Sequence, residues 1–82
     1  MFQEKDNALH ASFKFADFTQ AWSFMTEVAM VAEKMGHHPN WSNVYNEVNI
    51  TLTTHDAGNT ITKKDMILAE CITKIAKRIS GK

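Results

Sequence analysis

Three of the four histidines in this 82-residue chain lie in two short segments, each at the end of a predicted regular element. His37 and His38 are consecutive and precede Pro39, and His55 follows a strand-like run. Histidine both gives and takes a proton near neutral pH. Histidines clustered at the ends of elements, with carboxylates nearby, therefore suggest proton-transfer chemistry on a small molecule.

Three carboxylates accompany these histidines in the sequence: Glu33, Asp56 and Asp65. Glu33 precedes His37 by four positions, a spacing that places two side chains on one face of a helix. If the end of that helix meets the end of the strand before His55, three imidazoles and up to three carboxylates surround one cavity. The sequence thus predicts a single site built from segments far apart in the chain.

Two other interpretations of the histidines stay open: ordinary surface residues, or ligands of a zinc ion. Three histidines and a carboxylate can bind zinc tetrahedrally. Consecutive histidines are awkward ligands for one ion, however, and no His-Glu-x-x-His motif is present. We therefore expect neither a metal ion nor a cofactor. We interpret His10 as a surface residue, and Trp41 and Tyr45 as sheet packing rather than substrate platforms.

The first half of the chain predicts a strand followed by a long helix. Apolar residues alternate over residues 9–15, the period of a half-buried strand. Asp17 and Gly36 then bracket a predicted helix as its two caps. Its apolar stripe comprises Phe18, Ala21, Trp22, Met25, Val28, Ala29, Ala32 and Met35, and Phe24, Met30 and Val31 widen it. A helix this apolar in a small domain either spans a thick core or packs against another subunit.

The second half predicts a hairpin and a second helix. Residues 41–54 alternate, with Val44, Val48, Ile50 and Leu52 in phase and a turn expected near Asn46-Glu47. Thr62 and Asp65 form a capping box for a helix that extends to about Ile79. The order strand-helix-strand-strand-helix predicts one α+β domain over residues 1–82. We expect an antiparallel sheet of three to four strands with two helices packed on one face.

Composition excludes several classes of protein. Nine acidic residues balance nine basic ones, so no long-range field attracts nucleic acid directly. No apolar run is long enough for a membrane span, and the N-terminus lacks an apolar signal core. Cys71 is the only cysteine, which excludes an intrachain disulfide and fits a small buried apolar residue. A cytoplasmic location is the default, with the nucleus also open if the source is eukaryotic.

Several of these residues stand at spacings that resemble a known family. They are Glu33, His37-His38-Pro39, Tyr45 and Ile50, supported by Phe13-Lys14-Phe15, Asp17-Phe18, Asn40-Trp41, Thr53-Thr54-His55-Asp56-Ala57-Gly58 and Asp65. Over residues 8–79 the chain resembles the pterin-4a-carbinolamine dehydratase family. The resemblance implies dehydration of a 4a-hydroxytetrahydropterin to the quinonoid dihydropterin, which supports recycling of the tetrahydrobiopterin used by aromatic amino acid hydroxylases.

The resemblance also implies roles for individual residues. The catalytic histidines are His37, His38 and His55, of which His37 and His55 are acids and His38 mainly holds the pterin. The implied substrate-binding positions are Glu33, Gly36, His38, Thr53, Thr54 and Asp56.

The resemblance has departures and an alternative function. Relatives usually carry an N-terminal helix, which we expect this domain to lack, and the loop from His55 to Asp65 is slightly longer here. Gly36 replaces an acidic residue of some members. Some relatives are also dimerisation cofactors of a homeodomain transcription factor, so a non-catalytic binding module is the alternative. We expect a homotetramer, a dimer of dimers in which Phe24 and Val31 meet symmetry mates.

Overall fold

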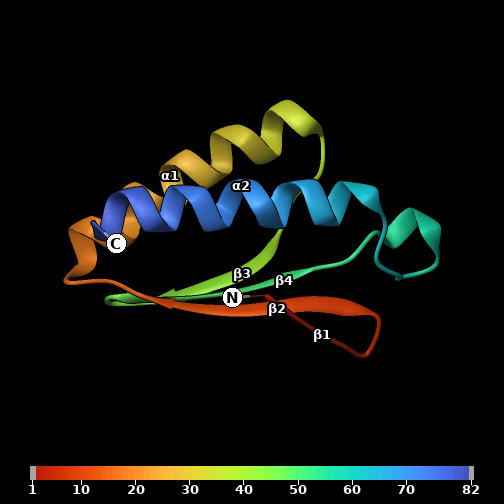
Figure 1. The fold of residues 1–82 in the computed structure, drawn as a ribbon, viewed down its shortest axis with the longest axis horizontal. Helices are drawn as coiled ribbons and strands as arrows, with labels where there is room; N and C mark the ends of the chain where they lie inside the picture. Colours follow the sequence, from red (N-terminus) through yellow and green to blue (C-terminus); the bar gives the residue numbers. More distant parts are fainter. Residues whose placement is uncertain (1, 82) are drawn as a thin grey trace.

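Two helices cover one face of a four-stranded antiparallel sheet in the computed structural model, which describes residues 2–81 (Figure 1). The sheet order is β1-β2-β4-β3. The strands are β1 (Gln3–Lys5), β2 (Ala8–Lys14), β3 (Asn40–Val44) and β4 (Glu47–Leu52). The helices are α1 (Phe18–Met35), the short 3₁₀ helix η1 (His55–Ala57) and α2 (Lys63–Ser80). The predicted α+β class, with both long helices on one face, is confirmed.

Strand β1 is an addition to the predicted order, which began with the strand now labelled β2. Its three residues are polar and exposed, so they carry no alternation that sequence analysis could detect. Asp6 and Asn7 connect β1 to β2 with φ angles of 53° and 61°. A tight two-residue hairpin needs this left-handed conformation, and Asp and Asn adopt it more readily than most residues.

Helix α1 begins and ends at the predicted caps. The Asp17 carboxylate accepts a hydrogen bond from the Gln20 amide at 2.8 Å. The Gln20 side chain accepts one from the Ala16 amide at 2.9 Å, one residue earlier than in a standard capping box. Gly36 ends the helix with a φ of 66°, a conformation that suits glycine.

The prediction of which α1 residues face the core was partly wrong. Phe24 is fully buried and Val31 packs against the core, although both were expected to meet symmetry mates. Phe18 and Trp22, which were assigned to the main stripe, are 47% and 57% exposed and stack on each other. Because α1 is apolar on two sides, its spacing alone does not identify the buried one. The buried residues are Ala21, Phe24, Val28 and Ala32.

The hairpin turn lies one residue earlier than predicted. Val44 pairs with Glu47 across a two-residue loop of Tyr45 and Asn46. Facing residues of an antiparallel pair lie on the same side of a sheet, so Val44 shares the outer face with Glu47 and is 72% exposed. The expectation that Val44 is in phase with Val48 was therefore wrong, because the short loop reverses the parity between the strands.

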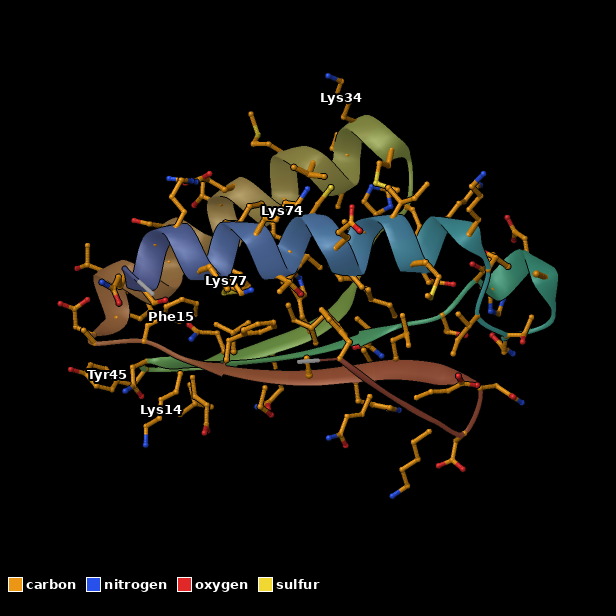
Figure 2. All side chains as sticks on the ribbon, viewed as in Figure 1. Lys14, Phe15, Lys34, Tyr45, Lys74 and Lys77 are labelled. Carbon is orange, nitrogen blue, oxygen red and sulfur yellow. The ribbon has the colours of Figure 1, made fainter. Side chains whose placement is uncertain are left out.

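The core fills the space between the sheet and the two helices. Phe15 points into this space, whereas its neighbour Lys14 points away from the helices (Figure 2). Leu68 and Ile72 of α2 are completely buried there, and Cys71 is only half-buried. Within residues 2–81, no helix has the length and apolarity needed to cross a membrane.

Candidate active site

One cleft lies where the end of α1 meets the end of β4 and the beginning of α2. These segments lie toward the same end of the molecule (Figure 1). The cleft has a volume of about 190 Å³, and its lining is Gly36, His37, His38, Thr53, Thr54, His55, Asp56 and Lys64. We call it the histidine cleft. All of the predicted site residues except Glu33 line it, and Glu33 lies beside it in contact with His38.

His37 is the buried histidine of the cleft, with 9% of its surface exposed. It follows the C-cap of α1, and its amide donates to the Ala32 carbonyl at 3.0 Å. Its Nε2 lies 2.5 Å from Oδ1 of Asp65 at the start of α2. A short bond between imidazole and carboxylate is charge-assisted and strong, so it fixes the orientation of the His37 ring.

Asp65 lies completely buried beneath the cleft. Its Oδ2 accepts from the Thr62 amide at 2.9 Å and from the Thr54 hydroxyl at 2.7 Å. Burial alone would raise the pKa of this carboxyl. The hydrogen bonds from His37, from the Thr62 backbone and from Thr54 outweigh burial, so the pKa lies below its ordinary value of 3.8. Asp65 is therefore an anion at neutral pH, next to His37.

The other two cleft histidines are each held by a neighbour close in sequence. Nε2 of His38 lies 2.9 Å from the Glu33 carboxylate. The predicted proximity of Glu33 and His37 on one helix face therefore gives no hydrogen bond, because the helix ends at Gly36 and the chain turns. Nδ1 of His55 lies 2.9 Å from Oδ1 of Asn59.

These contacts assign a tautomer to each neutral imidazole. Carboxylate and amide oxygens only accept hydrogen bonds, so the ring nitrogen beside each of them carries the proton. Within residues 2–81, the other ring nitrogen of each histidine has no hydrogen-bond partner. That second nitrogen is Nδ1 in His37 and His38 and Nε2 in His55. Each of these three rings therefore has one nitrogen that no described protein group occupies.

The sequence prediction missed the structural roles of three residues at this site. Asp65 was expected only as a cap and a nearby carboxylate, yet it holds His37 from below. Lys64 lines the cleft and Asn59 holds His55. The Thr62–Asp65 capping box predicts that Lys64 and Asp65 lie in the first turn of a helix. No pattern among neighbouring residues indicates that this turn faces the histidines.

A larger hollow of about 420 Å³ lies on the outer face of the sheet and includes His10. Both ring nitrogens of His10 have partners, the Lys5 carbonyl at 3.1 Å and the Thr51 hydroxyl at 3.2 Å. His10 was interpreted as a surface residue, and it is half-buried with both ring nitrogens engaged by the sheet. Within residues 2–81, no three His, Cys, Asp or Glu side chains are grouped to hold a metal ion.

The chain is similar to known proteins of one family. Residues 2–75 match the model of the family described as pterin 4 alpha carbinolamine dehydratase. Relatives from Burkholderia pseudomallei and Burkholderia mallei, which carry the provisional name pterin-4-alpha-carbinolamine dehydratase, are each 51% identical over 71 residues. That alignment covers 87% of this chain and 69% of each relative.

Two solved structures are similar to the fold described above. One is a transcriptional coactivator/pterin dehydratase from Brucella melitensis, with 44% identity and a TM-score of 0.87 over 92% of this chain and 81% of that one. The other is a pterin dehydratase-like protein identified as a RuBisCO assembly factor in the alpha-carboxysome. It is 26% identical, with a TM-score of 0.75 over 93% of this chain and 87% of that one.

Proposed function

The chain belongs to the pterin 4 alpha carbinolamine dehydratase family, and we propose that it dehydrates a 4a-hydroxytetrahydropterin to the quinonoid dihydropterin. The observation that carries this proposal is the meeting of His37, His38 and His55 in one cleft. In each of them one ring nitrogen is bound to a protein oxygen and the other is free for a substrate.

The reaction needs one proton donor and one proton acceptor. Hydroxide is a poor leaving group, so a proton from an imidazolium goes to the 4a-hydroxyl oxygen as the C4a–O bond breaks. The lone pair of N5 forms the C4a=N5 double bond, and the N5 proton leaves to a base. The products are water and the quinonoid dihydropterin, and the proton lost from N5 replaces the one that was donated.

His37 and His55 are the proposed acids, and they reach the cleft from different elements. His37 follows α1, and His55 begins η1 after β4. Two acids from different sides allow either face of the carbinolamine to lose its hydroxyl group. The buried Asp65 carboxylate restricts the His37 ring to one orientation, as a third group does in catalytic triads.

Backbone groups and His38 are the proposed means of holding the pterin. A pterin is flat and carries many donors and acceptors, which a free strand end can match. Thr53 lies beyond Leu52, the last residue of β4 that pairs with β2, and Gly36 offers backbone without a side chain. The Thr54 backbone is already bonded to Thr60 and Asn59, so we propose that Thr54 contributes as part of the cleft wall. His38 is held by Glu33, and we place Asp56 with them as a substrate-binding residue.

The direct test adds the protein to a pterin-dependent aromatic amino acid hydroxylase reaction. Decay of the 4a-carbinolamine is followed by ultraviolet absorbance. We expect decay well above the spontaneous rate and proportional to the protein concentration. Decay at the spontaneous rate would contradict the proposal.

We expect the reaction to need no metal ion. The proposed chemistry uses only imidazole protons, so extensive chelation followed by gel filtration should leave kcat unchanged. The measurement combines the absorbance assay with elemental analysis of the same samples. Stoichiometric zinc that is lost together with the activity, and restores it when added back, would favour a zinc site instead.

The second candidate function is that of a binding module for another protein. The Brucella melitensis structure, described as a transcriptional coactivator as well as a pterin dehydratase, favours it. The exposed apolar side chains of α1, which are Phe18, Trp22 and Met30, offer a surface for such a partner. A pulldown reports the partner and turnover reports the enzyme, so the two functions are tested separately.

We also propose that this α1 surface joins copies of the chain, most simply through a four-helix contact in a homotetramer. Trp22 is 57% exposed, so Trp22→Asp should leave the fold intact while placing a charge in the contact. Light scattering should show a tetramer for the wild type and a smaller species for this variant. Lys77→Asp, on the exposed side of α2, is the control and should stay tetrameric. A monomeric wild type at micromolar concentration would refute the assembly.

A further inference from the structure

We propose that Asn59 is a positioning residue for His55. Its side-chain carbonyl accepts the Nδ1 proton of His55, so Nε2 is the nitrogen presented to the histidine cleft. The 2.9 Å contact between these two side chains carries the inference. The catalytic consequence rests on the proposed function, whereas the tautomer itself does not.

Asn59 is held in place from both sides by backbone hydrogen bonds. Its own amide donates to the Thr54 carbonyl at 3.1 Å. The next residue, Thr60, forms a β-bridge with Thr54, whose amide donates to the Thr60 carbonyl at 2.9 Å. Asn59 therefore lies at the end of a compact loop that contains η1. Its side chain contacts His55, the first residue of η1.

The backbone of Asn59 favours this residue type. Its φ is 57°, the left-handed region that asparagine enters more readily than most other non-glycine residues. Asparagine supplies both the left-handed backbone and a carbonyl acceptor, whereas glycine would supply the backbone alone. Replacement by glycine therefore removes the side-chain hydrogen bond without adding backbone strain.

The bond matters because His55 is exposed and its ring has no other hydrogen-bond partner within residues 2–81. An imidazole without a fixed partner samples both tautomers and several rotamers. Which nitrogen carries the proton is set by the bond that the other nitrogen makes. Asn59 thus does for His55 what Asp65 does for His37, but with a neutral acceptor.

The first experiment measures the tautomer directly. Long-range ¹H–¹⁵N correlation spectra of the histidine rings are recorded at a pH where the rings are neutral. The peaks of His55 are identified by their loss in His55→Ala. We expect a protonated Nδ1 and an unprotonated Nε2 in the wild type, and a mixture of tautomers in Asn59→Gly. Unchanged His55 shifts in Asn59→Gly would overturn the proposal.

The second experiment measures turnover by Asn59 variants. Asn59→Gly should lower kcat about three- to tenfold, the effect of one neutral hydrogen bond, and leave KM unchanged. Asn59→Asp keeps an acceptor and adds a charge that stabilises the imidazolium. It should retain turnover and shift the pH profile of kcat to higher pH. In a His55→Ala background, Asn59→Gly should have no further effect.

The outcomes separate this proposal from the proposed function. An active wild type with an unaffected kcat in Asn59→Gly would overturn the role of Asn59 alone. A further loss in the His55→Ala background would show that Asn59 acts through the fold rather than through His55. A wild type with the Nδ1–H signature but no dehydration would overturn the proposed function, and with it the catalytic consequence of this bond.

Discussion

His37→Ala should lower kcat for carbinolamine dehydration by roughly 10²-fold or more, the usual contribution of a positioned general acid. His37 is the buried member of the three cleft histidines, and its Nε2 is tied to Asp65. Only Nδ1 is left for the substrate, so no other atom of this residue can supply the proton. Steady-state kinetics with the ultraviolet assay give kcat and KM separately.

His37→Gln distinguishes lost chemistry from lost structure. Alanine leaves the buried Asp65 carboxylate without one of its donors, which also costs stability. The glutamine amide can still donate to Asp65 but does not act as an acid. His37→Gln should therefore be closer to the wild type in thermal unfolding and yet as inactive as His37→Ala. Recovery of kcat by glutamine would mean that His37 acts through structure.

The other two histidines provide contrasting variants. His55→Ala should also lower kcat, as expected for a second acid. His38→Ala should mainly raise KM, because a residue that binds substrate and transition state equally affects binding alone. Wild-type rates in all three alanine variants would refute the assigned roles.

The ends of the helices were predictable because their signals are local. Asp17 and Gly36 bracket α1, and the Thr62–Asp65 capping box opens α2. Each signal involves only a few neighbouring residues. It arises because the N–H and C=O groups at a helix end have no partner within the helix and need another one. These ends place the histidines at two turns of the chain, but the sequence left open whether the two turns meet, because that depends on tertiary packing.

The orientation of apolar faces was less predictable. Phe24 and Trp22 are two positions apart on a helix that is apolar on both sides, and only the packing decides which of them is buried. Here Phe24 packs against Phe13 and Phe15, with ring centroids 5.2 and 4.8 Å apart. Phe13 lies on β2 and Phe15 directly follows it, so the spacing within α1 alone does not show which side is buried.

The support of the site was the least predictable part. His37 and Asp65 are 28 residues apart in sequence, and their contact depends on how α2 lies against the end of α1. Asp65 was correctly predicted as a member of the capping box that opens α2. The sequence did not show that the second carboxylate oxygen of the same residue holds a histidine, because a capping pattern concerns only the residue's own helix.

Asp65→Ala should destabilise the fold by about 1–3 kcal/mol for each buried donor that loses its acceptor. The carboxylate is completely buried and accepts from His37, Thr62 and Thr54. Its removal leaves three donors without their acceptor. Typical domains are stable by about 5–15 kcal/mol, so a large share is lost. Urea unfolding followed by circular dichroism measures the change.

Asp65→Asn tests the charge itself through the pH dependence of stability. The pKa of Asp65 is lowered in the folded state, so the wild type binds fewer protons folded than unfolded. The contribution of ionised Asp65 to stability is therefore fully present above its ordinary pKa of 3.8. It is lost as the pH falls through the lower pKa of the folded state. Asp65→Asn should lack that acid-dependent loss. Asp17→Asn is the matched control, since Asp17 caps α1 at an exposed site and asparagine caps equally well. Equal acid slopes for wild type and Asp65→Asn would show that the charge of Asp65 does not stabilise the fold.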